Sequence, residues 1–242
     1  MSPLLAQEIP EGLNVRRAAK LTAWLGIAYS LLVLGSYYML SLAPRPSSSD
    51  EEYLAFYDSD ETRVILIAGL YLMPFAGIAF MWFIVMLRAW IRRTASRVDD
   101  LFSSVQLVSG ILYLALFLTA AAAISVLSAG GGSPEAAIDP STKRQFTQMG
   151  WGLVVVFAMR MAAIFVITTT TLGRRHRFLP QWFVILGYLV GAFLLLSANT
   201  APFLILVLPG WTLLLGLLLL ARARSLPTTV GPTPSSPSED GA

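Results

Sequence analysis

Arg160 is the residue whose chemistry most needs an explanation, because it stands inside an apolar run that reads "FAMRMAAIF". A guanidinium carries five hydrogen-bond donors and a charge that proteins do not remove. At the centre of a bilayer an arginine costs at least about 2.5–3.5 kcal/mol. The apolar run 146–172 would place Arg160 roughly 20 Å from either interface, farther than its side chain reaches. We therefore expect polar partners from other helices.

Two prolines and two tyrosines are the first candidates for those partners. Pro74 and Pro209 stand inside apolar runs, where each ring removes an N–H and frees a carbonyl about four residues earlier. Tyr71 and Tyr188 supply hydroxyls. Further candidates with polar side chains in apolar runs are Tyr113, Gln106 and Thr119. The arrangement predicts a structural contact between helices, with an anion or polar-ligand contact and an acidic helix of a partner protein as the alternatives.

Other kinds of chemistry have little support in the residue types. The chain has no cysteine and a single histidine, His176, set among arginines, which excludes disulfides and thiolate or multi-histidine metal sites. The carboxylates Asp58, Asp60 and Glu61 lack the spacing of a twelve-residue calcium loop. We find no nucleophile elbow and no phosphate-binding loop. We predict no metal site, no cofactor and no enzymatic activity.

The elements that must position Arg160 are transmembrane helices. The chain has 242 residues, of which 56% are apolar and 13% charged, against about 25% charged in soluble domains. A helix crosses a ~30 Å hydrocarbon core with roughly 20 apolar residues, and lipid-exposed backbone must be paired within its own segment. The predicted fold is an all-α bundle of six spans at about 21–43, 64–87, 101–127, 146–172, 182–198 and 203–221.

The basic residues divide between the two sides of this bundle. With six spans, twelve of the lysines and arginines at the span ends fall on one side and four on the other. Basic flanks mark the cytoplasmic side, so we expect both termini in the cytoplasm. Residues 1–20 would then form a cytoplasmic segment, 21–221 the membrane domain and 222–242 a disordered Pro/Ser/Thr-rich tail. The flanks also account for the net charge of +3, so nucleic acid is not expected as a partner.

One small-residue pattern bears on helix packing. Gly187 and Gly191 form a GxxxG match in "GYLVG". Small residues at this spacing let two helices approach closely in a membrane. The pattern predicts packing of the helix at 182–198 against a neighbour, and it is too common to indicate dimerisation.

Three stretches together carry a resemblance to known proteins. They are "AGLYLMPFAGIAFMWFIVMLR" (68–88), "AMRMAAIFVITTTTLGRR" (158–175) and "LPQWFVILGYLVG" (179–191). As a set they resemble uncharacterised multi-pass membrane proteins of actinobacterial type, which have no assigned activity. The resemblance implies a bacterial plasma membrane, draws attention to Arg160 and Pro74, and transfers no catalytic or ligand residue.

The function expected from these features is non-enzymatic. We predict a structural or accessory component of the lipid bilayer that packs with another membrane protein or with a second copy of itself. The alternative is a small transporter or channel that uses Arg160 as a polar or anion contact near the proline-kinked helices.

Overall fold

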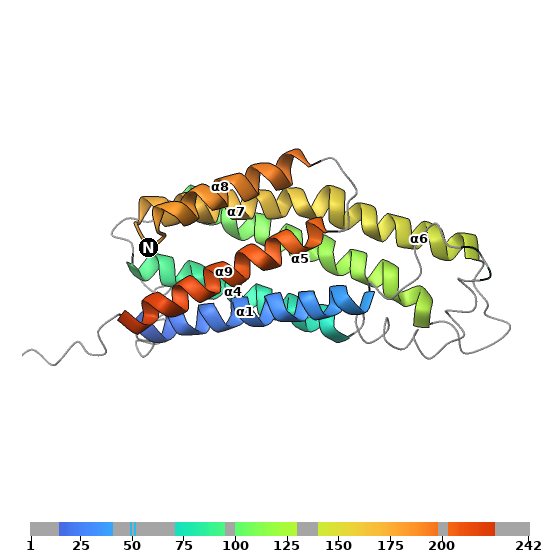
Figure 1. The fold of residues 1–242 in the computed structure, drawn as a ribbon, viewed down its shortest axis with the longest axis horizontal. Helices are drawn as coiled ribbons and strands as arrows, with labels where there is room; N and C mark the ends of the chain where they lie inside the picture. Colours follow the sequence, from blue (N-terminus) through green and yellow to red (C-terminus); the bar gives the residue numbers. More distant parts are fainter. Residues whose placement is uncertain are drawn as a thin grey trace, which may run out of the picture.

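The computed structural model describes residues 15–40, 49, 51, 71–94, 100–129, 140–197 and 203–225, and within them it contains helices and no strand. The elements are α1 (Val15–Leu40), α4 (Met73–Thr94), α5 (Asp100–Ala129), α6 (Pro140–Gly152), a π-helical segment η3 (Leu153–Ala158), α7 (Met159–Arg175), α8 (Gln181–Leu196) and α9 (Leu204–Ser225). Figure 1 shows them as one elongated bundle. The predicted all-helical class is confirmed for this part of the chain.

Five of the helical segments are long and apolar enough to cross a membrane. They are Arg16–Met39, Met73–Arg92, Asp100–Ile124, Arg144–Arg175 and Leu204–Arg224. Each overlaps a predicted span. The helix at the remaining predicted span, α8, is apolar but has 16 residues, fewer than the roughly 20 that a ~30 Å core requires.

The helix ends differ from the predicted boundaries at both termini. α1 begins at Val15, inside the segment expected to precede the membrane domain, and α9 continues to Ser225, so the first residues of the expected tail are helical. Predicted features that lie outside the described residues are 1–14, 41–43, 64–70, 198, 226–242 and the acidic residues Asp58, Asp60 and Glu61.

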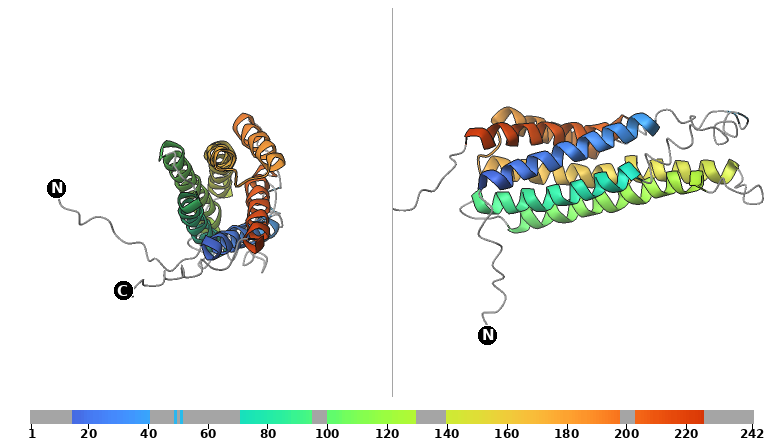
Figure 2. Two further views of the ribbon diagram at one scale, coloured as in Figure 1. Left: turned by 90° about the vertical axis from the view of Figure 1, so that its left-hand side faces the viewer. Right: turned by 90° about the horizontal axis from the view of Figure 1, so that it is seen from below.

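The helices pack in a fixed order around the bundle. α1 packs against α4 and α9, α4 against α5, α5 against α7, and α7 against α8. The end-on view in Figure 2 shows α7 inside this arrangement and α8 at its margin. Most residues of α7 are buried, because α5 and α8 both pack against it.

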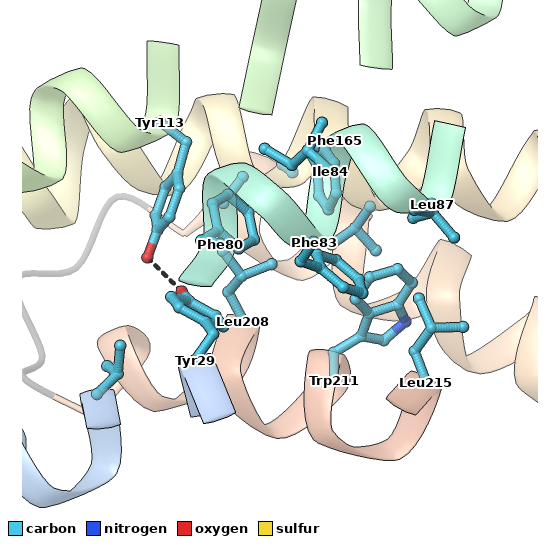
Figure 3. Close-up of a cluster of buried hydrophobic side chains, with 14 of the residues drawn as sticks. Tyr29, Phe80, Phe83, Ile84, Leu87, Tyr113, Phe165, Leu208, Trp211 and Leu215 are labelled. Carbon is cyan, nitrogen blue, oxygen red and sulfur yellow. Dashed lines mark hydrogen bonds between the residues drawn. The ribbon is translucent and has the colours of Figure 1, made fainter. Parts of the chain in front are cut away.

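The centre of the bundle is filled by aromatic rings, and every one of the long helices contributes at least one. Phe80 contacts the rings of Tyr29, Tyr113 and Phe165 at centroid distances of 4.5, 5.2 and 5.4 Å, and Figure 3 shows these rings side by side. Trp211 joins the group through Phe165. We call the following the aromatic cluster, all of it fully or almost fully buried: Tyr29, Phe80, Phe83, Tyr113, Phe165, Phe183 and Trp211.

The two ends of the bundle differ in charge and in length. The start of α1 and the ends of α4, α7 and α9 lie together (Figure 1) and form what we call the basic end. Its described basic residues are Arg16, Arg17, Lys20, Arg88, Arg92, Arg174, Arg175, Arg177, Arg222 and Arg224. At the opposite end α5 and α6 project beyond the other helices (Figure 2). The 30 residues of α5 extend about 45 Å, well beyond a ~30 Å hydrocarbon core.

Helix α8 packs on α7 at two glycines. A Cβ atom added at Gly187 would lie 2.2 Å from Thr170 Oγ1, and one added at Gly191 would lie 2.4 Å from Ile167 Cγ1. Both distances are far below van der Waals contact, so glycine is what allows the two backbones to approach. These are the glycines of the GxxxG pattern.

This packing predicts opposite effects of one substitution at two positions. Gly187→Ala should lower the stability of the protein by about 1–3 kcal/mol because it overpacks the α7–α8 contact. Gly35→Ala should leave it unchanged or raise it by up to about 1 kcal/mol, because alanine favours helix and no neighbouring atom lies within 4 Å of the new methyl group. Thermal unfolding in detergent, followed by tryptophan fluorescence, measures both effects. Equal shifts of the unfolding midpoint in the two variants would contradict the close α7–α8 packing at Gly187.

Candidate functional site

Arg160 lies on α7, two residues after η3 ends, and its side chain is half-buried. Its guanidinium Nη1 donates a hydrogen bond to the carbonyl of Val156. Val156 belongs to η3, so this partner is on the same continuous helical segment. The hydrogen bond recorded for Arg160 in the described residues is thus to its own helical segment, and the expectation of partners on other helices stays a prediction.

The π-helical segment beside Arg160 changes the pairing of the backbone. Met159 N–H bonds to the carbonyl of Val154, five residues earlier, where an α-helix would use the residue four earlier. Such turns are rare and frequently occur at functional sites, and they shift the hydrogen-bond register of the residues around them. The Arg160 guanidinium binds a carbonyl inside this altered segment. Nothing in the apolar sequence of 153–158 predicted the turn.

The other predicted members of the site are distributed over the bundle. The Pro209 carbonyl, on α9, accepts a hydrogen bond from Ser30 Oγ of α1 at 2.8 Å. The Tyr188 hydroxyl lies 3.0 Å from Thr171 Oγ1 and joins α8 to α7. Pro74, in the first turn of α4, and Tyr71, two residues before α4 begins, are exposed on the surface of the bundle. The hydrogen bonds recorded for these described residues thus join other pairs of helices and do not gather them around Arg160.

The three further candidate partners of Arg160 also bond elsewhere. The Tyr113 hydroxyl lies 2.7 Å from that of Tyr29 (Figure 3). Gln106 Nε2 donates to Thr169 Oγ1 at 2.8 Å. Thr119 Oγ1 donates to a carbonyl one turn earlier on its own helix. Each of these three side chains therefore makes its recorded hydrogen bond away from Arg160.

Polar side chains inside the bundle join one helix to the next. Tyr29–Tyr113 connects α1 to α5, Ser30–Pro209 connects α1 to α9, Gln106–Thr169 connects α5 to α7, and Thr171–Tyr188 connects α7 to α8. The partners in the first three contacts are 84, 179 and 63 residues apart, so no local spacing could have paired them. The sequence signal for these contacts was the presence of isolated polar residues in apolar runs, which indicates that such residues need partners but does not say which.

Hydroxyl groups that do not join helices are mostly satisfied within their own helix. Thr22 and Thr168 each donate to the carbonyl four residues earlier, a common arrangement for Ser and Thr in membrane helices. Five side chains that are fully or almost fully buried keep a polar atom without a partner in the described part of the chain: Ser36 Oγ, Gln106 Oε1, Thr170 Oγ1, Thr212 Oγ1 and Trp211 Nε1.

The position of Arg160 along the bundle follows from the α7–α8 contacts. The two helices are antiparallel, and Gly187 meets Thr170 while Gly191 meets both Ile167 and the carbonyl of Ala163. Five residues further, at its last residue, α8 is level with the turn of α7 that holds Arg160. Arg160 therefore lies where α8 ends.

Helices long and apolar enough to span a bilayer, aromatic packing inside them and large apolar side chains on their outer faces define an all-helical membrane protein. Comparison of the chain with known protein families, with curated protein sequences and with solved structures finds no match.

The Tyr29–Tyr113 contact is open to a double-mutant cycle. Either Tyr29→Phe or Tyr113→Phe leaves one buried hydroxyl without its partner and should lower the free energy of unfolding by about 1–3 kcal/mol. The double variant should cost less than the sum of the two, because it removes both hydroxyls and keeps the rings. Tyr71→Phe, at an exposed tyrosine, is the control and should change stability by less than about 0.5 kcal/mol. Strict additivity would show that the two hydroxyls do not interact.

Proposed function

We propose that this protein is a six-span, non-enzymatic structural or accessory component of a bacterial plasma membrane, with both termini in the cytoplasm. The path of the chain supports the sixth span, because α8 leads away from the basic end and α9 leads back to it (Figure 1). The positive-inside rule assigns the basic end to the cytoplasm. The resemblance to actinobacterial membrane proteins supports the choice of membrane.

The observation that carries a structural role is how the interior of the bundle is used. Its polar side chains bond neighbouring helices to one another, and its centre is occupied by the aromatic cluster. Buried polar contacts and tight ring packing of this kind fix the relative positions of helices. Such contacts favour a rigid bundle that offers its surface to a partner. They disfavour a bundle that opens a path for a substrate.

The surface most suited to a partner is the projecting α5–α6 hairpin. The two helices are held together where Gly150 packs against Ile124 and the carbonyl of Ala120. On the otherwise polar α6, Phe146 and Met149 are 42% and 53% exposed. They are three residues apart and so lie on one face. Exposed apolar side chains at this spacing favour contact with another membrane protein or with a second copy of the chain.

The transporter or channel is the second candidate. It has in its favour the π-helical turn next to Arg160, since such turns concentrate at functional sites. In this alternative Arg160 would contact an anion as it crosses the membrane.

Quantitative mass spectrometry of proteins that co-purify with the full chain, extracted from native membrane without detergent, tests the proposed role. We expect one stoichiometric membrane partner, or a second copy of the chain. Its amount should fall about tenfold or more in the Phe146→Ala/Met149→Ala double variant, because apolar residues at the centre of a contact carry most of its free energy.

The matched control is Gln145→Ala/Gln148→Ala, which changes two exposed polar residues of the same helix and should leave the partner bound. A monomeric chain without a stoichiometric partner, together with anion flux in proteoliposomes that Arg160→Gln abolishes, would replace the accessory role by the transporter.

A further inference from the structure

Helix α8 is too short to reach both surfaces of a bilayer that the other helices cross. Its 16 residues extend about 24 Å, against a ~30 Å hydrocarbon core. It starts at the basic end, so the missing length is at the opposite end. Figure 1 shows that α8 stops there while the segment of α6, η3 and α7 beside it continues. A short span is accommodated by local thinning of the bilayer.

Arg160 lies on the stripe of α7 that α8 covers, at the place where the cover stops. Ala163, Ile167 and Thr170 contact the glycines of α8, and continuing this helical spacing one step back leads to Arg160. Along the stripe, Thr170 is fully buried beneath α8, whereas Phe157, beyond the end of α8, is 56% exposed. The half-buried Arg160 is at the boundary between the covered and uncovered parts.

The guanidinium is directed towards the opposite end of the bundle. Its hydrogen bond to Val156 leads towards the start of α7 and away from the basic end. That bond uses one of its five donors. Within α1, α4, α5, α6, η3, α7, α8 and α9 as the structure describes them, the one carboxylate is Asp100, at the start of α5 and at the basic end; Glu51, described between α1 and α4, is exposed. The C-terminal end of α8 adds partial negative charge near Arg160.

The depth of Arg160 is within reach of lipid headgroups. Arg174, at the basic end, follows it by fourteen residues on the same helix, which is about 21 Å. Arg160 is then roughly 9 Å below the far edge of a ~30 Å core. A long arginine side chain covers several ångströms of that distance, and thinning over the end of α8 shortens the rest.

We propose that Arg160 binds the phosphate of an anionic phospholipid in the leaflet at the opposite end of the bundle, with the headgroup against the part of the α7 stripe that α8 leaves uncovered. Arginine suits this ligand because its planar fork donates two parallel hydrogen bonds to phosphate oxygens. The site rests on the six-span threading proposed above. It does not depend on the partner surface of α6, so the co-purification experiment and the experiment below fail separately.

Native mass spectrometry of the full chain, released from nanodiscs that contain equal parts of phosphatidylglycerol and phosphatidylcholine, counts the retained lipids. The wild-type protein should retain one more phosphatidylglycerol molecule than Arg160→Gln, whose occupancy at this site should fall about tenfold or more with the loss of charge-assisted hydrogen bonds. Arg144→Gln is the control, since it removes the same charge from the same end, on α6, and should retain the lipid.

Two results would overturn the proposal. One is an equal phosphatidylglycerol count in the wild type and in a folded Arg160→Gln protein. The other is that inorganic phosphate protects the delipidated wild type, but not Arg160→Gln, against thermal unfolding, while the two proteins retain equal numbers of lipids. This result would make a soluble anion the ligand.

A second variant tests the site with Arg160 left in place. Leu195, in the last turn of α8, is 44% exposed and lies four residues after Gly191, on the face of α8 that meets α7, so Leu195→Asp puts a carboxylate near the guanidinium of Arg160. The protein should then lose one phosphatidylglycerol molecule, because the carboxylate replaces the phosphate. An unchanged count in this variant would refute the proposal even where Arg160→Gln does not fold.

Discussion

Hydrocarbon surrounds most of this molecule, and that constraint orders the rest of the structure. A backbone amide that faces lipid has no water to bond, so each segment pairs its own amides and carbonyls as a helix. Large apolar side chains such as Trp82, Leu189 and Phe193 are exposed on the outer faces, where they would be a liability in water. Inside the bundle, polar side chains such as Tyr29, Gln106 and Thr171 bond to a neighbouring helix or to a carbonyl of their own helix.

Arg160 shows how this constraint acts on a charge. From the sequence alone, Arg160 lies at the middle of one apolar run, and this position predicts polar partners on other helices. In the structure the short helix α8 ends beside it, and its guanidinium turns to a carbonyl of the π-helical segment. With the six-span threading that we propose, the cost of burying this charge is reduced because Arg160 lies close to the bilayer surface. The tyrosines, the glutamine and the prolines expected around Arg160 do not form a buried cluster there.

The helical class, the run of apolar segments and the close approach at Gly187 and Gly191 follow from composition and spacing, which are local properties. The contacts of Arg160 do not, because they depend on where α8 ends relative to α7. Tyr29 and Tyr113, 84 residues apart, had no pattern to connect them. The π-helical turn at 153–158 arises inside a uniform run of Leu, Val and Phe, where α-helical and π-helical pairing look alike in sequence.

The threading underlies both the assignment of α8 as a span and the depth of Arg160, and single cysteines test it directly because the chain has none of its own. In intact bacterial cells, a membrane-impermeant maleimide should label Ser141→Cys, on exposed α6, and should leave Ser2→Cys and Ser238→Cys unlabelled until the membrane is permeabilised. Labelling of one chain end and protection of the other in intact cells would mean an odd number of crossings. It would remove the basis for six spans.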